Sequence, residues 1–96
     1  MEEELIPADE FCIHHHIEMS FIHALENSGL IATRFTEERV YIPSHELDQL
    51  EKLVRLHEME INIEGIETVS YLLQQMHDMQ QELIQLKNRL QQFGEL

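Results

Sequence analysis

Three consecutive histidines, His14, His15 and His16, are the residues whose type first suggests metal chemistry, and His23 follows nearby. Neighbouring residues of a helix point about 100° apart, whereas metal-binding pairs usually lie four residues apart on one face. His14 could therefore converge with one further histidine at most. We interpret these histidines as surface and turn residues, and we expect neither a metal site nor a cofactor.

Cys12 is the only cysteine, and it would be a nucleophile only beside a base such as His15 or His16. Its neighbours Phe11 and Ile13 are apolar, which favours a small buried core residue. The sequence contains no glycine-rich phosphate loop, nucleophile elbow or paired-carboxylate signature. We therefore expect no enzymatic activity. A single cysteine also excludes an internal disulfide and a zinc finger, and it is typical of a reducing compartment.

The chain is strongly acidic: its 96 residues include 19 Asp and Glu against 6 Lys and Arg, which gives a formal net charge of -13 at pH 7. No lysine or arginine precedes Arg34. Because non-specific binding to nucleic acid depends on cations that neutralise phosphates, this composition predicts no direct contact with DNA. It favours a basic protein partner instead.

We expect neither a membrane-spanning segment nor a secretory signal in this sequence. No apolar run approaches the roughly 20 residues that a membrane-spanning helix needs, and residues 2–4 are acidic where a secretory signal would be basic. We therefore expect a cytoplasmic protein that does not contact membranes.

The elements that must position these residues are predicted to be mainly helical, because glycine and proline are scarce. After a short edge strand at 5–6, helices are expected over 8–15 and over 18 to 27 or 28, with Gly29 as the stop of the second. The turn between them falls at His16, which gives a helix-turn-helix layout. Histidine tolerates the left-handed conformation that such a turn needs better than most residues.

The next segment predicts a hairpin wing, with strands over 30–35 and 39–42 joined by a short polar turn. Ser44 is expected to be the N-cap of a third helix that runs to about Glu58. The apolar face of that helix is supplied by Leu47, Leu50, Leu53, Val54 and Leu56.

A final helix is predicted from Ile63 to about Phe93, with Asn62 as its N-cap and Ile61 and Ile66 as a hydrophobic staple. Eight apolar residues of this helix alternate at spacings of three and four, which is a heptad repeat. We call them the seam: Val69, Leu72, Met76, Met79, Leu83, Leu86, Leu90 and Phe93.

The seam predicts a homodimer, because a helix about 46 Å long extends beyond what the small N-terminal part can cover. The alternative is that the seam packs within its own monomer. We therefore predict a mainly α-helical, MerR-like winged helix-turn-helix with a small β-hairpin wing over residues 1–60. It is followed by a C-terminal coiled-coil dimerisation helix over 61–96, the two forming one compact unit.

The order of elements resembles that of MerR-type regulators, with Gly29-Leu30 and Arg39-Val40-Tyr41 at the positions of that family's pattern. A closer resemblance is to the chaperone-modulator family CbpM, small MerR-like proteins without a separate effector domain. The residues that carry it are 10–14, 29–30, 55–58 and 61–66.

The CbpM resemblance implies binding to the J-domain of a CbpA/DnaJ-like co-chaperone. It implies inhibition of that protein's co-chaperone and DNA-binding activities, and association with the nucleoid through the partner. J-domains present a basic helix, so the acidic charge of this chain agrees with the resemblance. The alternative is a MerR-like DNA-binding transcription regulator, for which the predicted wing offers only Arg34 and Arg39 as cations. A coiled-coil adaptor with an unrelated partner is a third hypothesis.

Two groups of carboxylates are candidates for contact with a basic partner. The helix-pair carboxylates are Glu10, Glu18 and Glu26, and the junction carboxylates are Glu58, Glu60, Glu64 and Glu67. Either group could equally be an ordinary solvated helix surface. We favour the junction carboxylates, because Ile61 or Ile63 beside them would add apolar contact area.

Overall fold

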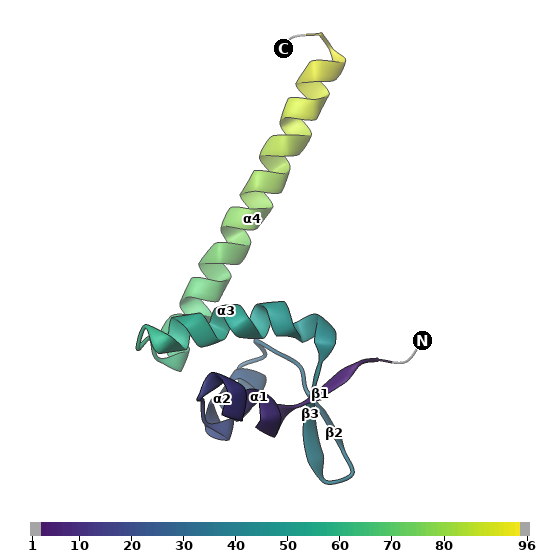
Figure 1. Ribbon diagram of the computed structural model, residues 1–96. Coiled ribbons are helices and arrows are strands. Elements are labelled where there is room, and N and C mark those ends of the chain that lie inside the picture. Colours follow the sequence, from purple (N-terminus) through teal and green to yellow (C-terminus); the bar gives the residue numbers. More distant parts are fainter. Residues whose placement is uncertain (1–2, 95–96) are drawn as a thin grey trace.

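The computed structural model describes residues 3–94 as a winged helix-turn-helix unit from which one long helix projects (Figure 1). The elements in chain order are β1 (Leu5–Pro7), α1 (Ala8–His15), α2 (Met19–Asn27), β2 (Arg34–Thr36), β3 (Arg39–Pro43), the 3-10 helix η1 (Ser44–Glu46), α3 (Leu47–Glu58) and α4 (Ile63–Gln92). The prediction of a mainly helical winged-helix protein with a long C-terminal helix is confirmed.

The turn between α1 and α2 is made by His16, which has a left-handed backbone conformation at φ 57° and ψ 44°. The backbone N–H of Ile17 donates to the carbonyl of Cys12 at 3.0 Å, which closes the C-terminus of α1 in the way that a left-handed residue permits. Gly29, with φ 76°, follows α2 in the same conformation. The expected helix-turn-helix layout is therefore confirmed.

The wing belongs to a three-stranded antiparallel sheet with the order β1-β3-β2. Thr36 pairs with Arg39, so the hairpin loop consists of Glu37 and Glu38 alone. Both have positive φ, 52° and 62°, as a type I′ turn requires. Asn and Gly are preferred at such positions, so this turn is made by unfavourable residue types.

The strand expected over 30–35 is wrong for residues 30–33, because β2 begins only at Arg34. Leu30 and Ile31 of this segment pack in or against the hydrophobic core instead of pairing in a sheet. The N–H of Leu30 donates to the carbonyl of Leu25 at the end of α2, and Ile31 is buried. The N–H of Ala32 then donates to the Glu46 carboxylate at 3.2 Å.

The expected N-cap at Ser44 is also wrong. Its backbone N–H donates to the carbonyl of Glu4 at 2.9 Å, which continues the pairing between β1 and β3. The chain therefore leaves the sheet through the single turn η1, and α3 begins at Leu47 without a side-chain cap.

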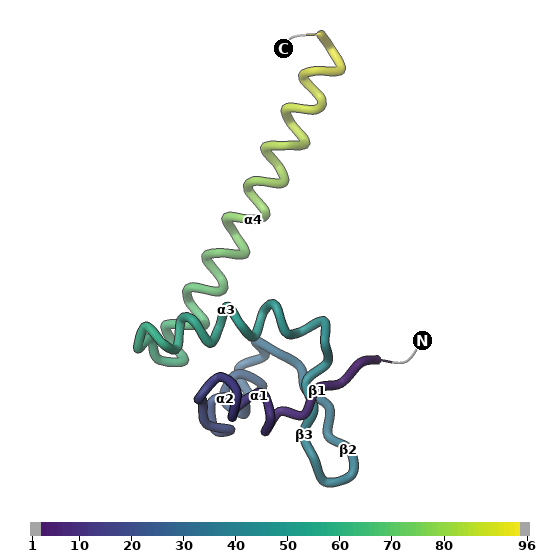
Figure 2. Tube along the Cα trace, viewed as in Figure 1, coloured from purple at the N-terminus to yellow at the C-terminus, as the bar shows by residue number. Residues whose placement is uncertain are grey.

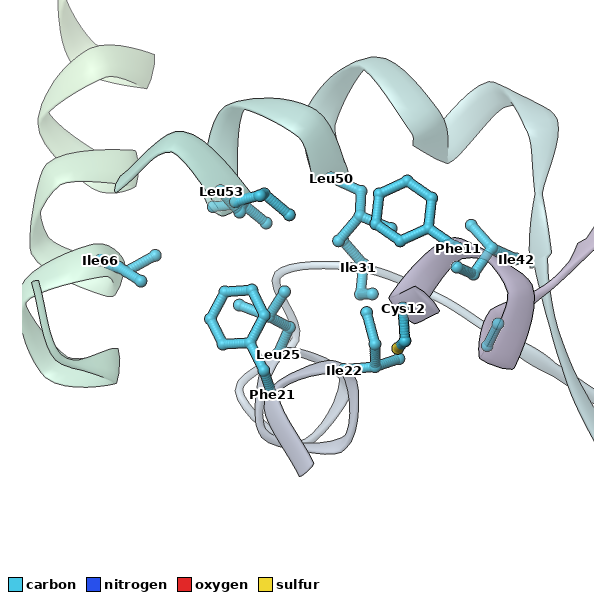
Figure 3. Close-up of a cluster of buried hydrophobic side chains, with 12 residues drawn as sticks. Phe11, Cys12, Phe21, Ile22, Leu25, Ile31, Ile42, Leu50, Leu53 and Ile66 are labelled. Atoms are coloured by element: carbon cyan, nitrogen blue, oxygen red, sulfur yellow. The ribbon is translucent and has the colours of Figure 1, made fainter. Parts of the chain in front are cut away.

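One hydrophobic core joins the helices, the wing and the start of α4 (Figure 3). Helices α1, α2 and α3 supply most of it, while Ile42 comes from β3 and Ile66 from α4. The buried hydrophobic residues are Ala8, Phe11, Cys12, Phe21, Ile22, Leu25, Ile31, Ile42, Leu50, Leu53, Val54 and Ile66. The expected apolar face of α3 is confirmed, with Leu47 and Leu56 packed at its edges.

Helix α4 begins as expected, because the Oδ1 atom of Asn62 accepts the N–H of Gly65 at 2.8 Å. A β-carbon on Gly65 would lie 2.7 Å from Cγ2 of Ile61, so glycine allows the close approach at this start. Ile66 is the only buried residue of α4. Beyond it the helix runs away from the winged unit, and the molecule measures 59 × 37 × 21 Å (Figure 2).

Candidate partner-binding surfaces

The three histidines of α1 and its turn lie in different environments. The ring of His15 stacks on Phe11 with centroids 4.1 Å apart, and His14 meets His15 edge-on at 4.9 Å. His16 is the left-handed turn residue. Among residues 3–94, no three His, Cys, Asp or Glu side chains lie close enough to hold a metal ion.

Cys12 is buried in the core, as its apolar neighbours indicate. Desolvation, with a smaller contribution from the negative charge of Asp9, raises the pKa of the Cys12 thiol. A protonated, buried thiol is a packing residue and a poor nucleophile.

Both arginines of the wing are held by carboxylates of the N-terminal segment. Arg34 binds Glu3 through two hydrogen bonds, from Nε and from Nη2, each 3.1 Å long. Nη2 of Arg39 lies 3.0 Å from the Asp9 carboxylate and 3.6 Å from that of Glu10. The hydrogen bond from Arg39 lowers the pKa of Asp9 and raises the pKa of Arg39. These pairs join residues some thirty positions apart, and no local pattern in the sequence indicates them.

The helix-pair carboxylates lie apart from one another and make local contacts. Glu10 lies on α1 near Arg39. Glu18 precedes α2 and accepts the Ser20 hydroxyl at 3.4 Å. Glu26, at the opposite end of α2, accepts the hydroxyl of Thr33.

The junction carboxylates lie where α3 turns into α4. Glu58 ends α3, Glu60 occupies the connection with φ 64°, and Glu64 and Glu67 lie on the first two turns of α4. All four side chains are exposed. Within residues 3–94 none of them forms an ion pair, in contrast to Glu3, Asp9 and Glu10. Ile61 and Ile63 between them are half-buried.

A concave, largely apolar surface lies between α2 and this junction, and we call it the junction hollow. Phe21 and His57 both line it, and their rings stack with centroids 4.1 Å apart and planes 20° apart. Two adjoining depressions of about 520 and 320 Å³ share Phe21, His57 and Ile63. The remaining lining residues are His16, Ile17, Glu18, Ser20, Ala24, Glu60, Ile61 and Asn62. Reasoning from sequence missed this site, because Phe21 and His57 meet only in the folded chain.

The seam of α4 is exposed along almost its whole length. From Leu72 to Phe93 its residues are between 46% and 78% exposed, and only Val69 is half-buried. Leu73 and Ile84 widen the apolar surface at 51% and 50% exposure. From Leu72 to Phe93 the seam therefore does not pack against the rest of its own chain, whereas Val69 does so in part.

Two short helices joined at a tight turn, with a hairpin wing and a helix behind them, define the class of the winged helix-turn-helix proteins. The family model described as MerR HTH family regulatory protein matches residues 6–88, and the chain belongs to this family. Regulators of this family are typically non-enzymatic. The match spans β1 to most of α4, so it covers the junction and most of the seam.

No match was found among curated proteins or among solved structures. No helix that the structure describes is long and apolar enough to cross a membrane.

Proposed function

We propose that this protein is a non-enzymatic chaperone modulator that binds the J-domain of a CbpA/DnaJ-like co-chaperone. Binding would inhibit the partner's co-chaperone and DNA-binding activities. The observation that carries the proposal is the distribution of charge: the junction carboxylates are exposed and unpaired within residues 3–94, whereas both wing arginines are ion-paired. A surface of this kind attracts a basic protein helix and repels phosphate.

The proposed active form is a homodimer through the seam. A monomer would leave a row of apolar side chains in water along α4, and exposed apolar surfaces of this extent mark association sites. The heptad spacing favours a second helix as the occupant. Two copies would then present two junctions to the partner.

The experiment that tests this proposal reverses Glu60, Glu64 and Glu67 to lysine together. Association with a purified J-domain should become slower, and its salt dependence should flatten, because complementary charge acts mainly on the encounter rate. Helical content and dimerisation should be unchanged. The matched control reverses the exposed carboxylates Glu37, Glu38 and Glu51, which gives the same change in net charge away from the junction.

An association rate that the junction reversal leaves unchanged would contradict this location and direct the search to Glu10, Glu18 and Glu26. Failure of the wild-type protein to bind any J-domain would contradict the proposed function itself.

The second candidate is a DNA-binding transcription regulator, which membership of the MerR family favours. In a winged helix-turn-helix the second helix and the wing face DNA. Here α2 carries no lysine or arginine, and Arg34 and Arg39 would have to leave Glu3 and Asp9 before reaching a phosphate. Gel-shift titration with duplex DNA at physiological salt distinguishes the two candidates.

A further inference from the structure

We propose that the junction hollow receives an apolar side chain of a cationic amphipathic helix, while Glu18 and Glu60 on its rim bind the basic residues of that helix. The inference rests on the proposed function, because it specifies how the basic helix of the partner would be held. It adds an apolar anchor site, on the α2 side of the junction, to the charged surface already described.

The lining of the hollow is chemically suited to an apolar anchor side chain. The half-buried side chains of Ile61 and Ile63 offer an apolar floor beside the stacked rings of Phe21 and His57. Ile17 and Ala24 extend that floor toward the turn of the helix-turn-helix. At about 320 Å³ the depression that Ala24 lines has room for a leucine-sized side chain. A buried apolar anchor surrounded by polar contacts is the usual arrangement at the centre of a protein interface.

The formal charge around the hollow is negative. Glu18 and Glu60 belong to the lining, and within residues 3–94 no lysine or arginine lines either depression. Glu58 and Glu64 add negative charge on either side of Glu60 in the sequence. The surroundings therefore favour a cationic occupant over a nucleotide, a phosphate or an acidic peptide.

A second copy of this chain is a poor occupant of the hollow. A second copy of the chain carries a formal net charge of -13, so its approach to an acidic rim is opposed by repulsion over most of its surface. Helix α4, which carries the seam, runs away from α3 and the winged unit (Figure 1). No seam residue lines either depression, so a dimer through the seam can leave the hollow open to a different partner.

Rigid backbone on both sides makes the hollow a preformed site. Glu18 precedes the first turn of α2, directly after the hydrogen-bonded His16 turn. On the other side, Asn62 caps α4, and the N–H of Glu60 donates to the carbonyl of His57 at 2.9 Å. Because little order is lost when a partner binds to such a site, even a single anchor side chain contributes usefully to affinity.

The test uses the full chain and the variant Ala24→Leu, which fills the hollow with a residue that helices accept well. Its matched control is Ala32→Leu, the same change at an exposed position outside the lining. A second variant, Glu18→Gln with Glu60→Gln, keeps the shape of the hollow and removes its rim charge. Its control is Glu37→Gln with Glu38→Gln on the wing.

The first measurement is calorimetric titration with the isolated J-domain of a CbpA-type co-chaperone. Ala24→Leu should weaken binding by about tenfold or more, as truncation or blocking of an anchor site does. The Glu18/Glu60 double variant should weaken binding less and lower its salt dependence. Both controls should bind like the wild type. Undiminished binding by Ala24→Leu would contradict the role of the hollow as an anchor site, while the proposed function would stand.

The second measurement keeps the inference testable if no J-domain binds. An 18-residue model helix of leucine and lysine is titrated against the chain with its isoleucine methyl groups labelled for NMR. The resonances of Ile17, Ile61 and Ile63 should shift, and Ala24→Leu but not Ala32→Leu should weaken that binding. Shifts elsewhere, or equal binding by both variants, would overturn the proposal. The proposal would also be overturned if these methyl resonances shifted when the protein was concentrated without the model helix, because the hollow would then bind a second copy of the chain.

Discussion

The guanidinium of Arg39 lies 3.0 Å from the carboxylate of Asp9 and thereby joins the wing strand β3 to α1. Arg34 on β2 is joined in the same way to Glu3, which precedes β1. The two arginines that a winged helix would turn toward DNA are thus ion-paired with carboxylates of the same chain. Their positive charge is neutralised where a phosphate contact would need it.

Specific binding to duplex DNA is therefore not expected. The prediction is checked by gel-shift titration against the promoter region of the protein's own gene and against random duplexes at physiological salt. Nanomolar affinity for one sequence would contradict it. Glu3→Gln combined with Asp9→Asn and Glu10→Gln is an informative companion, because it releases both arginines and should raise only the weak, non-specific affinity.

Asp9→Asn should change how the free energy of unfolding depends on pH below pH 6. The hydrogen bond from Arg39 lowers the pKa of Asp9 in the folded state. The stabilisation is present above the unfolded-state value of about 3.9 and is lost as the pH falls through the lower folded-state pKa. Urea unfolding from pH 6 downward should lose less stability in the variant than in the wild type. Asp48→Asn, an exposed carboxylate on the first turn of α3, serves as the control. Equal slopes for all three proteins would contradict the prediction.

Leu83→Glu should convert a dimer into a monomer. The substitution places an unpaired carboxylate in the middle of the seam, where pairing with a second helix would desolvate it. Light scattering should show twice the chain mass of 11.4 kDa for the wild type at tens of micromolar, and the single mass for the variant. Gln81→Glu, which adds the same charge off the seam, should remain dimeric. A monomeric wild type at that concentration would refute the dimer.

Replacing the wing turn Glu37-Glu38 by Asn-Gly should stabilise the protein by roughly 1 kcal/mol or more. Both glutamates have positive φ, a conformation that residues with a β-carbon adopt at a cost and that Asn and Gly accept in type I′ turns. Thermal or urea unfolding measures the gain. The control Glu37→Gln with Glu38→Gln removes the charges without relieving the backbone and should gain much less. A lower midpoint for Asn-Gly would contradict the assigned turn.

Cys12 should react slowly with iodoacetamide in the folded protein and rapidly after unfolding. Burial protects the thiol and raises its pKa, so little thiolate is present at neutral pH. Folding stability should accordingly fall as the pH rises above the unfolded-state pKa of about 8.5 toward the higher folded-state value. Mass spectrometry of modified protein with and without urea gives the comparison. Equal rates in both conditions would show that Cys12 is accessible.

Those parts of the fold that depend on neighbouring residues could be predicted from the sequence. Gly29 and Asn62 act on the helix ends beside them, and the seam repeats within one helix, so each signal is local. The segment from Leu30 misled the prediction, because apolar residues that cross the core resemble those of a strand. Arg39 with Asp9, and His57 with Phe21, meet only when distant segments pack, so the paired wing and the junction hollow required the structure.

Helix α4 anchors only its first turns in the core, through Ile66, and from Tyr71 onward every described residue is exposed. An unsupported helix of this kind is only marginally stable in water, because helical order depends largely on tertiary packing. Its amide hydrogens should therefore exchange far faster than those of α3 at high dilution. Protection should then rise as the protein is concentrated, so the order of the distal helix reports how many copies are present. The fraction of chains with an ordered distal helix would then depend on the concentration of the protein in the cell.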